Sequence, residues 1–164
     1  MKFELRQLTV NDGADVFQML KQIRTVENSF TNPVHDMTFD EFREWLVQQD
    51  GWNSAQNLPK GYVRQTVYWY YADGKPVGIG KIRHGLTPES RKNGGNIGYA
   101  IAYDYRGKGY GTGLLEELIR KAREFSIDEI LLTIDKGNYA SKTVAERNGG
   151  RLTDENDERW YYSL

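Results

Sequence analysis

Residues 97–112 read IGYAIAYDYRGKGYGT, and this stretch decides the fold class. Its first part, Ile97–Tyr103, is apolar and aromatic and predicts a strand. A glycine-rich run from Arg106 to Gly111 follows, and after it apolar residues recur at helical spacing: Leu114, Leu115, Leu118, Ile119, Ala122 and Phe125. Because the apolar run Ile130–Ile134 then predicts another strand, the order predicts a right-handed crossover with a ligand site after the first strand.

The remaining elements are read outward from this unit. Ile130–Ile134 shows no alternation of apolar and polar residues, which is typical of a strand covered on both faces. Lys2–Leu8 alternates and predicts a half-buried strand. Two helical patterns follow it, one carrying Val16, Leu20 and Ile23, the other beginning after Thr38 and carrying Phe39, Phe42, Trp45 and Leu46.

The middle of the chain changes from helical to strand periodicity. Thr66–Ala72 and Pro76–Arg83 flank the turn Asp73-Gly74-Lys75 and predict a β-hairpin. The aromatic run Tyr68-Trp69-Tyr70-Tyr71 alternates between two faces, so we expect core and sheet surface here rather than a stacking site. Loops are predicted over Asp50–Gly61 and Gly85–Asn93.

Length, composition and charge exclude several classes of protein. The chain has 164 residues and no long linker or repeat, which predicts one domain over residues 1–164. Lys and Arg total 22 against 23 Asp and Glu, so the total charge does not indicate a nucleic-acid partner. There is no cysteine, hence no disulfide, thiolate nucleophile or cysteine-bound metal, and we expect a cytoplasmic protein without a membrane span.

The glycine-rich run carries the clearest chemistry. Side-chain-free residues allow a ligand to approach the backbone, and the free amides and dipole of a helix start favour an anion. Arg106 and Lys108 add two cations, so we expect a phosphate or pyrophosphate. The spacing is not Gly-x-Gly-x-x-Gly, and Lys108 precedes Gly109 rather than Ser or Thr, which disfavours a dinucleotide fold and a phosphate-binding-loop nucleotidase.

Arg106-x-x-Gly109-x-Gly111 resembles the fingerprint of the GNAT superfamily of acetyl-CoA-dependent N-acetyltransferases. Further similarities to bacterial members are Gly94-Gly95-Asn96-Ile97-Gly98-Tyr99, Ile82-Arg83-His84, Asn138-x-x-Ser141 and Glu146-Arg147-Asn148-Gly149. The resemblance implies a set of residues that bind the cofactor, acetyl-CoA. These are Ile101, Ala102, Arg106, Gly107, Lys108, Gly109, Tyr110, Gly111, Thr112, Asn138 and Ser141.

The same resemblance implies a fold and an activity. The fold is an α/β GNAT fold, a mixed central sheet flanked by helices, in which splayed parallel strands form the CoA site. The activity is transfer of an acetyl group to a primary amine on a small molecule or a peptide. The acceptor itself stays open. We expect no metal, nucleic acid or membrane partner, and a homodimer is compatible with the sequence.

Acyl transfer to an amine needs a neutral amine, a donor to the oxyanion and a proton for the leaving thiolate. Without a cysteine or a legible Ser-His-Asp set, we expect direct attack in a ternary complex rather than an acetyl-enzyme. Many family members carry a tyrosine seven residues after the asparagine, where this chain has Ala145. Tyr103, Tyr110 and Tyr139 are the alternatives, together with protonation by water.

His84 is the leading candidate for the general base, because an unperturbed histidine titrates near neutral pH. Asn96 is the second catalytic candidate and is expected to position the acceptor or a water. Glu27 and Glu89 are further options. Because the usual tyrosine is missing, a catalytically weak regulator that binds acyl-CoA is the alternative function, and a nucleotide-binding interaction domain is a third.

Overall fold

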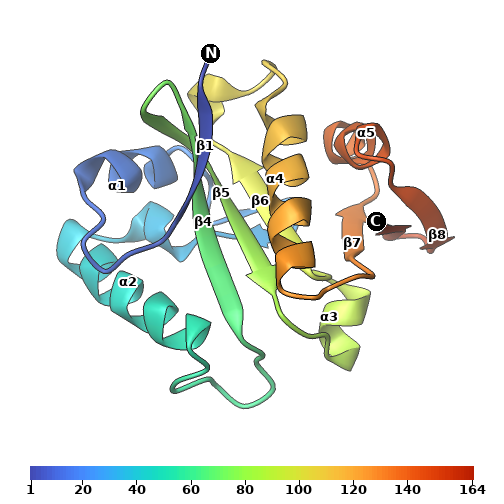
Figure 1. Ribbon diagram of the computed structural model, residues 1–164, viewed down its shortest axis with the longest axis horizontal. Coiled ribbons are helices and arrows are strands. Elements are labelled where there is room, and N and C mark those ends of the chain that lie inside the picture. The colour runs from blue at the N-terminus through green and yellow to red at the C-terminus, as the bar shows by residue number, and fades with distance from the viewer.

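The centre of the molecule is an antiparallel sheet of four strands, shown in Figure 1, a computed structural model of residues 1–164. The strands lie in the order β1-β4-β5-β6. Their bounds are β1 (Phe3–Gln7), β4 (Gln65–Ala72), β5 (Lys75–Arg83) and β6 (Ile97–Ile101). The predicted hairpin is confirmed, since β4 and β5 pair antiparallel from Gln65 opposite Arg83 to Ala72 opposite Lys75.

The turn of this hairpin explains its register. Asp73 and Gly74 both have positive φ angles, 49° and 78°, as a two-residue type I′ turn requires. The Asp73 carboxylate also accepts a hydrogen bond of 2.8 Å from the amide of Lys2, next to β1. The Asp73-Gly74 turn therefore holds together one end of β1, β4 and β5.

A second sheet has the order β7-β9-β8, with β7 (Leu131–Asp135), β8 (Arg151–Glu155) and β9 (Arg159–Ser163). Strands β6 and β7 are neighbours that belong to different sheets. Asn96, just before β6, joins them: its amide donates to the Leu131 carbonyl (2.8 Å), and its Oδ1 accepts from the Leu131 amide (2.9 Å). The two sheets separate beyond Asn96. The expected parallel direction of β6 and β7 stays a prediction.

Helices cover both faces of the four-stranded sheet (Figure 1). On one face lie α1 (Ala14–Lys21) and α2 (Phe39–Asn53), and on the other lies α4 (Tyr110–Glu124), between the two sheets. The other elements are α3 (Pro88–Lys92), α5 (Tyr139–Arg147), the short hairpin β2 (Val26–Glu27) and β3 (Phe30–Thr31), and the 3₁₀ turns η1 (Pro33–Asp36) and η2 (Tyr103–Tyr105). A capping box between Thr38 and Glu41 starts α2.

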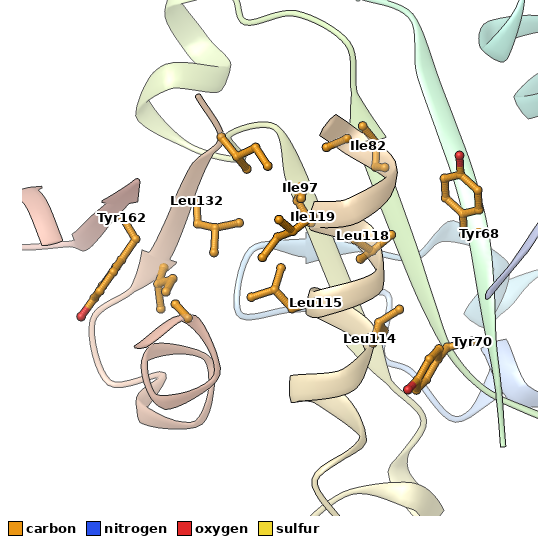
Figure 2. Close-up of a cluster of buried hydrophobic side chains, with 14 of the residues drawn as sticks. Tyr68, Tyr70, Ile82, Ile97, Leu114, Leu115, Leu118, Ile119, Leu132 and Tyr162 are labelled. Atoms are coloured by element: carbon orange, nitrogen blue, oxygen red, sulfur yellow. The ribbon is translucent and has the colours of Figure 1, made fainter. Parts of the chain in front are cut away.

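Two buried clusters hold these layers together. In the first, drawn in Figure 2, Leu114, Leu115 and Leu118 of α4 pack between the two sheets. The second joins α1 and α2 to the opposite face of the four-stranded sheet. Strand β4 contributes alternate residues to each, Tyr68 and Tyr70 to the first, Val67, Trp69 and Tyr71 to the second. The aromatic run was expected to lie partly in the core and partly on the sheet surface. The second part of this expectation is wrong, because helices cover both faces of the sheet.

Several predicted boundaries need correction. The strand predicted to reach Tyr103 ends at Ile101, where η2 begins to form. The apolar run Ile130–Ile134 is not covered on both faces, since Leu131 and Thr133 are partly exposed on the side away from α4. The predicted loops hold helical residues: α2 extends to Asn53, and α3 lies within Gly85–Asn93. The signal for α3 was Thr87 at the N-cap followed by Pro88, a standard helix start.

Candidate functional site

A cavity of about 680 Å³ opens between β6 and β7, beside the first turns of α4 and α5 and the β2–β3 hairpin. Most of the residues that the sequence assigned to the cofactor line it: Ile101, Arg106, Gly107, Gly109, Tyr110, Gly111, Thr112, Asn138 and Ser141. Ala102, Lys108, His84 and Asn96 do not line it. The local prediction at the glycine run thus leads to one cavity, whereas both catalytic candidates lie elsewhere.

The N-terminal end of α4 presents unused hydrogen-bond donors. The amides from Gly107 to Thr112 donate no hydrogen bond to any other group of the protein. Gly109 is the N-cap residue, with a left-handed φ of 82° and no capping side chain, and no acidic residue lies in the first turn. Thr112 Oγ1 is buried without a partner. These groups together favour an anion with several acceptor oxygens.

The edge of β6 supplies a second set of amides. The Arg83 amide donates to the Asn96 carbonyl, and the Ala102 amide donates to the Val77 carbonyl. These two hydrogen-bonded pairs show that the even-numbered residues along β6 form the backbone hydrogen bonds to β5. Because bonding alternates along an antiparallel pair, the amides of Tyr99 and Ile101 point toward the gap beside β7. The Ala102 amide donates to Val77 at 2.9 Å. The Ala102 amide is therefore used by β5, whereas the Ile101 amide faces the cavity, and the contacts of both residues with the cofactor stay predictions.

The two cations of the glycine run have separate positions. The Arg106 guanidinium points back into the cavity, where it pairs with Glu27 (2.6 Å) and donates to the Ile101 carbonyl (2.8 Å). Lys108 is exposed and does not line the cavity, and its ammonium lies over the ring of Tyr105, a cavity-lining residue. Its predicted contact with the cofactor stays a prediction. Arg147 of α5, which the sequence did not single out, lines the cavity instead.

A tyrosine missed at the sequence level crosses the cavity. The Tyr99 hydroxyl donates to Ser141 Oγ at 3.2 Å, and this oxygen also accepts from Asn138 Nδ2 at 3.0 Å. Burial raises the pKa of Tyr99 above its usual value, so the hydroxyl stays protonated at neutral pH. Ala145 lies one helical turn after Ser141, so the Tyr99 hydroxyl approaches the face of α5 that the missing tyrosine would occupy.

The three tyrosines proposed from sequence are less suitable. Tyr103 is 71% exposed and lies outside the cavity, and Tyr139 is 68% exposed with its ring against Trp160. Tyr110 turns its ring onto Phe3 and its hydroxyl toward Met1. None of the three hydroxyls forms a hydrogen bond with another cavity-lining residue.

His84 lies outside the cavity, on the far side of β5. Its Nε2 is 2.7 Å from Thr66 Oγ1, and its ring packs edge-on against Phe125 at 4.5 Å between centroids. Burial, with a smaller effect from Arg64, lowers the pKa of His84. The structure therefore gives His84 a packing role and does not bring it to the site.

A His84→Ala variant tests this placement. We expect a melting temperature lower by about 2–4 °C at pH 7.5, from the loss of the Thr66 bond and the Phe125 contact. This difference should shrink below pH 6.5, because the wild-type residue is neutral when folded and protonates more readily when unfolded. Differential scanning calorimetry across pH measures both effects, and loss of the acidic limb of the rate profile in the variant would contradict the placement.

Asn96 is buried, and both polar atoms of its side chain form hydrogen bonds within the protein. Its Nδ2 donates to the Arg83 carbonyl at 3.3 Å, while its Oδ1 accepts from Leu131. The residue therefore connects β5, β6 and β7 at the point where the sheets separate. Asn96 thus holds the strands together and does not line the cavity, and its predicted role in positioning the acceptor or a water stays a prediction.

No helix is both long and apolar enough to cross a bilayer. No group of three or more His, Cys, Asp or Glu side chains is arranged to hold a metal ion.

Comparison with solved structures identifies a common fold. RimL, a ribosomal L7/L12 alpha-N-protein acetyltransferase in complex with coenzyme A, is 19% identical with a TM-score of 0.73, over 99% of this chain and 93% of that one. The Campylobacter jejuni N-acetyltransferase PseH in complex with acetyl coenzyme A is 15% identical with a TM-score of 0.66, over 99% of this chain and 98% of that one. A Vibrio fischeri ribosomal-protein-S5-alanine acetyltransferase is 13% identical with a TM-score of 0.74, over 99% of this chain and 92% of that one.

Sequence comparison assigns the family. No curated protein sequence matches the chain. The sequence model described as the acetyltransferase (GNAT) domain matches residues 2–151, which includes the glycine run, β6, β7 and both helices that border the cavity. The chain therefore belongs to the GNAT acetyltransferase family.

Proposed function

We propose that the protein transfers the acetyl group of acetyl-CoA to a primary amine, with CoA bound in the cavity between β6 and β7. The observation that carries this proposal is the row of unbonded amides from Gly107 to Thr112 at the start of α4. A pyrophosphate supplies the oxygens that these donors lack. The unpartnered Thr112 hydroxyl is a further donor there, and Arg147 adds positive charge on the opposite wall.

The rest of the cavity fits an extended arm that carries amide groups. The edge of β6 offers the amides of Tyr99 and Ile101, and α5 offers Asn138 and Ser141. The apolar side chains Leu132, Ile134 and Val144 line the same cavity. Neutral donors and acceptors between apolar walls suit the pantetheine part of CoA, as the family resemblance implies.

Two groups are positioned to assist the acyl transfer. A β6 amide that points into the gap can donate to the carbonyl oxygen as it gains negative charge. The Tyr99 hydroxyl can donate a proton to the departing thiolate, since it is protonated and lies beside Ser141. Tyr99 would then take the place of the tyrosine that Ala145 replaces.

Nothing in the cavity is well placed to remove the proton of the amine. Glu27 is the only carboxylate in the lining, and Arg106 binds it. We propose that the amine reacts from its neutral fraction and releases its proton to solvent after attack. The apparent pKa of the rate profile should then follow the pKa of the acceptor.

Ligand-induced stabilisation tests the cofactor assignment. We expect CoA and acetyl-CoA to raise the melting temperature in a concentration-dependent way, because each binds the folded state alone. ATP and NAD should have much smaller effects, since the loop matches neither nucleotide motif. A thermal-shift titration with all four compounds measures this, and equal shifts would overturn the assignment to CoA.

Homodimer formation and a cytoplasmic location stay predictions.

A further inference from the structure

A second cavity, of about 510 Å³, adjoins the first. It lies between α2, the segment 61–65 and α3, with Trp45, Trp52 and Tyr62 among its walls. Four residues line both cavities: Thr31, Lys81, Arg83 and Asn93. The second cavity therefore adjoins the first at these four residues, and its size is that of a small-molecule site.

Two cations stand at the junction of the cavities. Lys81 and Arg83 are two residues apart on β5, so their side chains lie on the same face of the sheet. Neither forms an ion pair, although the structure has nine elsewhere. Lys81 Nζ donates to the Thr31 carbonyl at 3.0 Å and lies over the Phe30 ring. Arg83 donates to the carbonyls of Gly94 and Gly95.

The electrostatic setting of this pair is unfavourable without a counter-charge. Burial, with a smaller effect from Arg83, lowers the pKa of Lys81 to about 8, and burial also lowers the pKa of Arg83. Carboxylates in the two linings do not compensate, because Glu27 pairs with Arg106 and Glu89 is exposed and unpaired with either cation. Half-buried cations that have only carbonyl partners and no counter-charge are costly, so an anion that binds there would be stabilised strongly.

The proposed CoA phosphates do not supply this anion. Lys81 pairs with Gly98 and Arg83 lies next to Asn96, both at the start of β6, whereas the glycine run follows the end of β6 at Ile101. Gly98 and Ile101 are separated by about 10 Å at about 3.3 Å per residue. The arm of CoA proposed to lie between them is uncharged. The missing anion must then come with the second substrate.

We propose that the acceptor is an amine that also carries an anionic group, a carboxylate or a phosphate, and that Lys81 and Arg83 bind this group. Gly98, opposite Lys81, also lines the first cavity, and the Phe30 ring lies over it, 3.5 Å from the position of an added Cβ. The anion would fix one end of the acceptor in the shared part of the two cavities while its amine points toward the gap. This inference rests on the proposed function and deepens it by naming the substrate class.

Binding to the CoA complex tests the proposal directly. Calorimetry first measures CoA affinity, and then protein saturated with CoA is titrated with two matched pairs: phosphoethanolamine and ethanolamine, and β-alanine and β-alaninamide. We expect the member that carries the phosphate or carboxylate to bind, in at least one pair, about 10-fold or more tightly than the partner that lacks this anionic group, as a charge-assisted contact implies. The two pairs distinguish a phosphate from a carboxylate.

Variants assign this preference to the cations. Lys81→Met and Arg83→Met should each reduce the affinity for the member with the anionic group about 10-fold and leave the affinity for CoA within about 2-fold. Lys75→Met, at the exposed start of the same strand, is the matched control and should keep the preference. Equal binding within both pairs, no detectable binding of phosphoethanolamine or β-alanine, or a preference that survives both variants would overturn the proposal. If CoA itself fails to bind, the proposed function fails instead.

Discussion

A Gly109→Val protein should fold and yet bind CoA at least about 100-fold more weakly than the wild type, because the loss of two charge-assisted contacts has this effect. Gly109 has a φ of 82° and lines the cavity, and a Cβ placed there meets no protein atom within 4 Å. The side chain would therefore fill space that the proposed pyrophosphate needs. Isothermal titration calorimetry with CoA measures the loss.

A matched control separates this effect from backbone strain. Gly74 has nearly the same φ, 78°, and also has no protein atom within 4 Å of an added Cβ, but it lies in the β4–β5 turn. Both variants should lose about 1–2 kcal/mol of stability from the left-handed conformation. Gly74→Val should retain CoA affinity. Retained affinity in a folded Gly109→Val protein would contradict the assignment of the glycine run.

A Tyr99→Phe variant should lose about 100-fold in kcat, within the usual range for removal of a general acid. The hydroxyl forms its hydrogen bond with Ser141 only, so the fold and the affinity for CoA should change little. Tyr103→Phe is the control, since that hydroxyl lies outside the cavity on an exposed ring. Steady-state thiol release measures both. An unchanged kcat in Tyr99→Phe would show that solvent protonates the thiolate.

The features that the sequence predicts well are local ones. The glycine run is one of them, because left-handed φ angles and free amides at a helix start depend on a few consecutive residues. Gly107, Gly109 and the first turn of α4 accordingly lie where the sequence placed them. The β4–β5 hairpin is another, since the Asp73-Gly74 turn selects its register.

The features that the sequence missed depend on contacts between distant segments. Tyr99 becomes a candidate acid only because α5 brings Ser141 to it from 42 residues away. The alternation of side chains along β5 explains the position of His84: Lys81 and Arg83 face the cavities, so the next residue faces away. The same alternation places Lys81 and Arg83, two cations, on one face of an otherwise apolar strand.

The most direct test of the proposed activity is mass spectrometry of a reaction that contains protein, acetyl-CoA and an amine from the panel above, run beside a reaction without amine. The account predicts that free CoA and acetylated amine form in equal amounts only when amine is present, and that the mass of the protein does not change in either reaction. A protein adduct of about 42 Da that forms without amine and disappears on its addition would contradict direct transfer. CoA binding without acetylation of any amine would instead support the regulatory alternative.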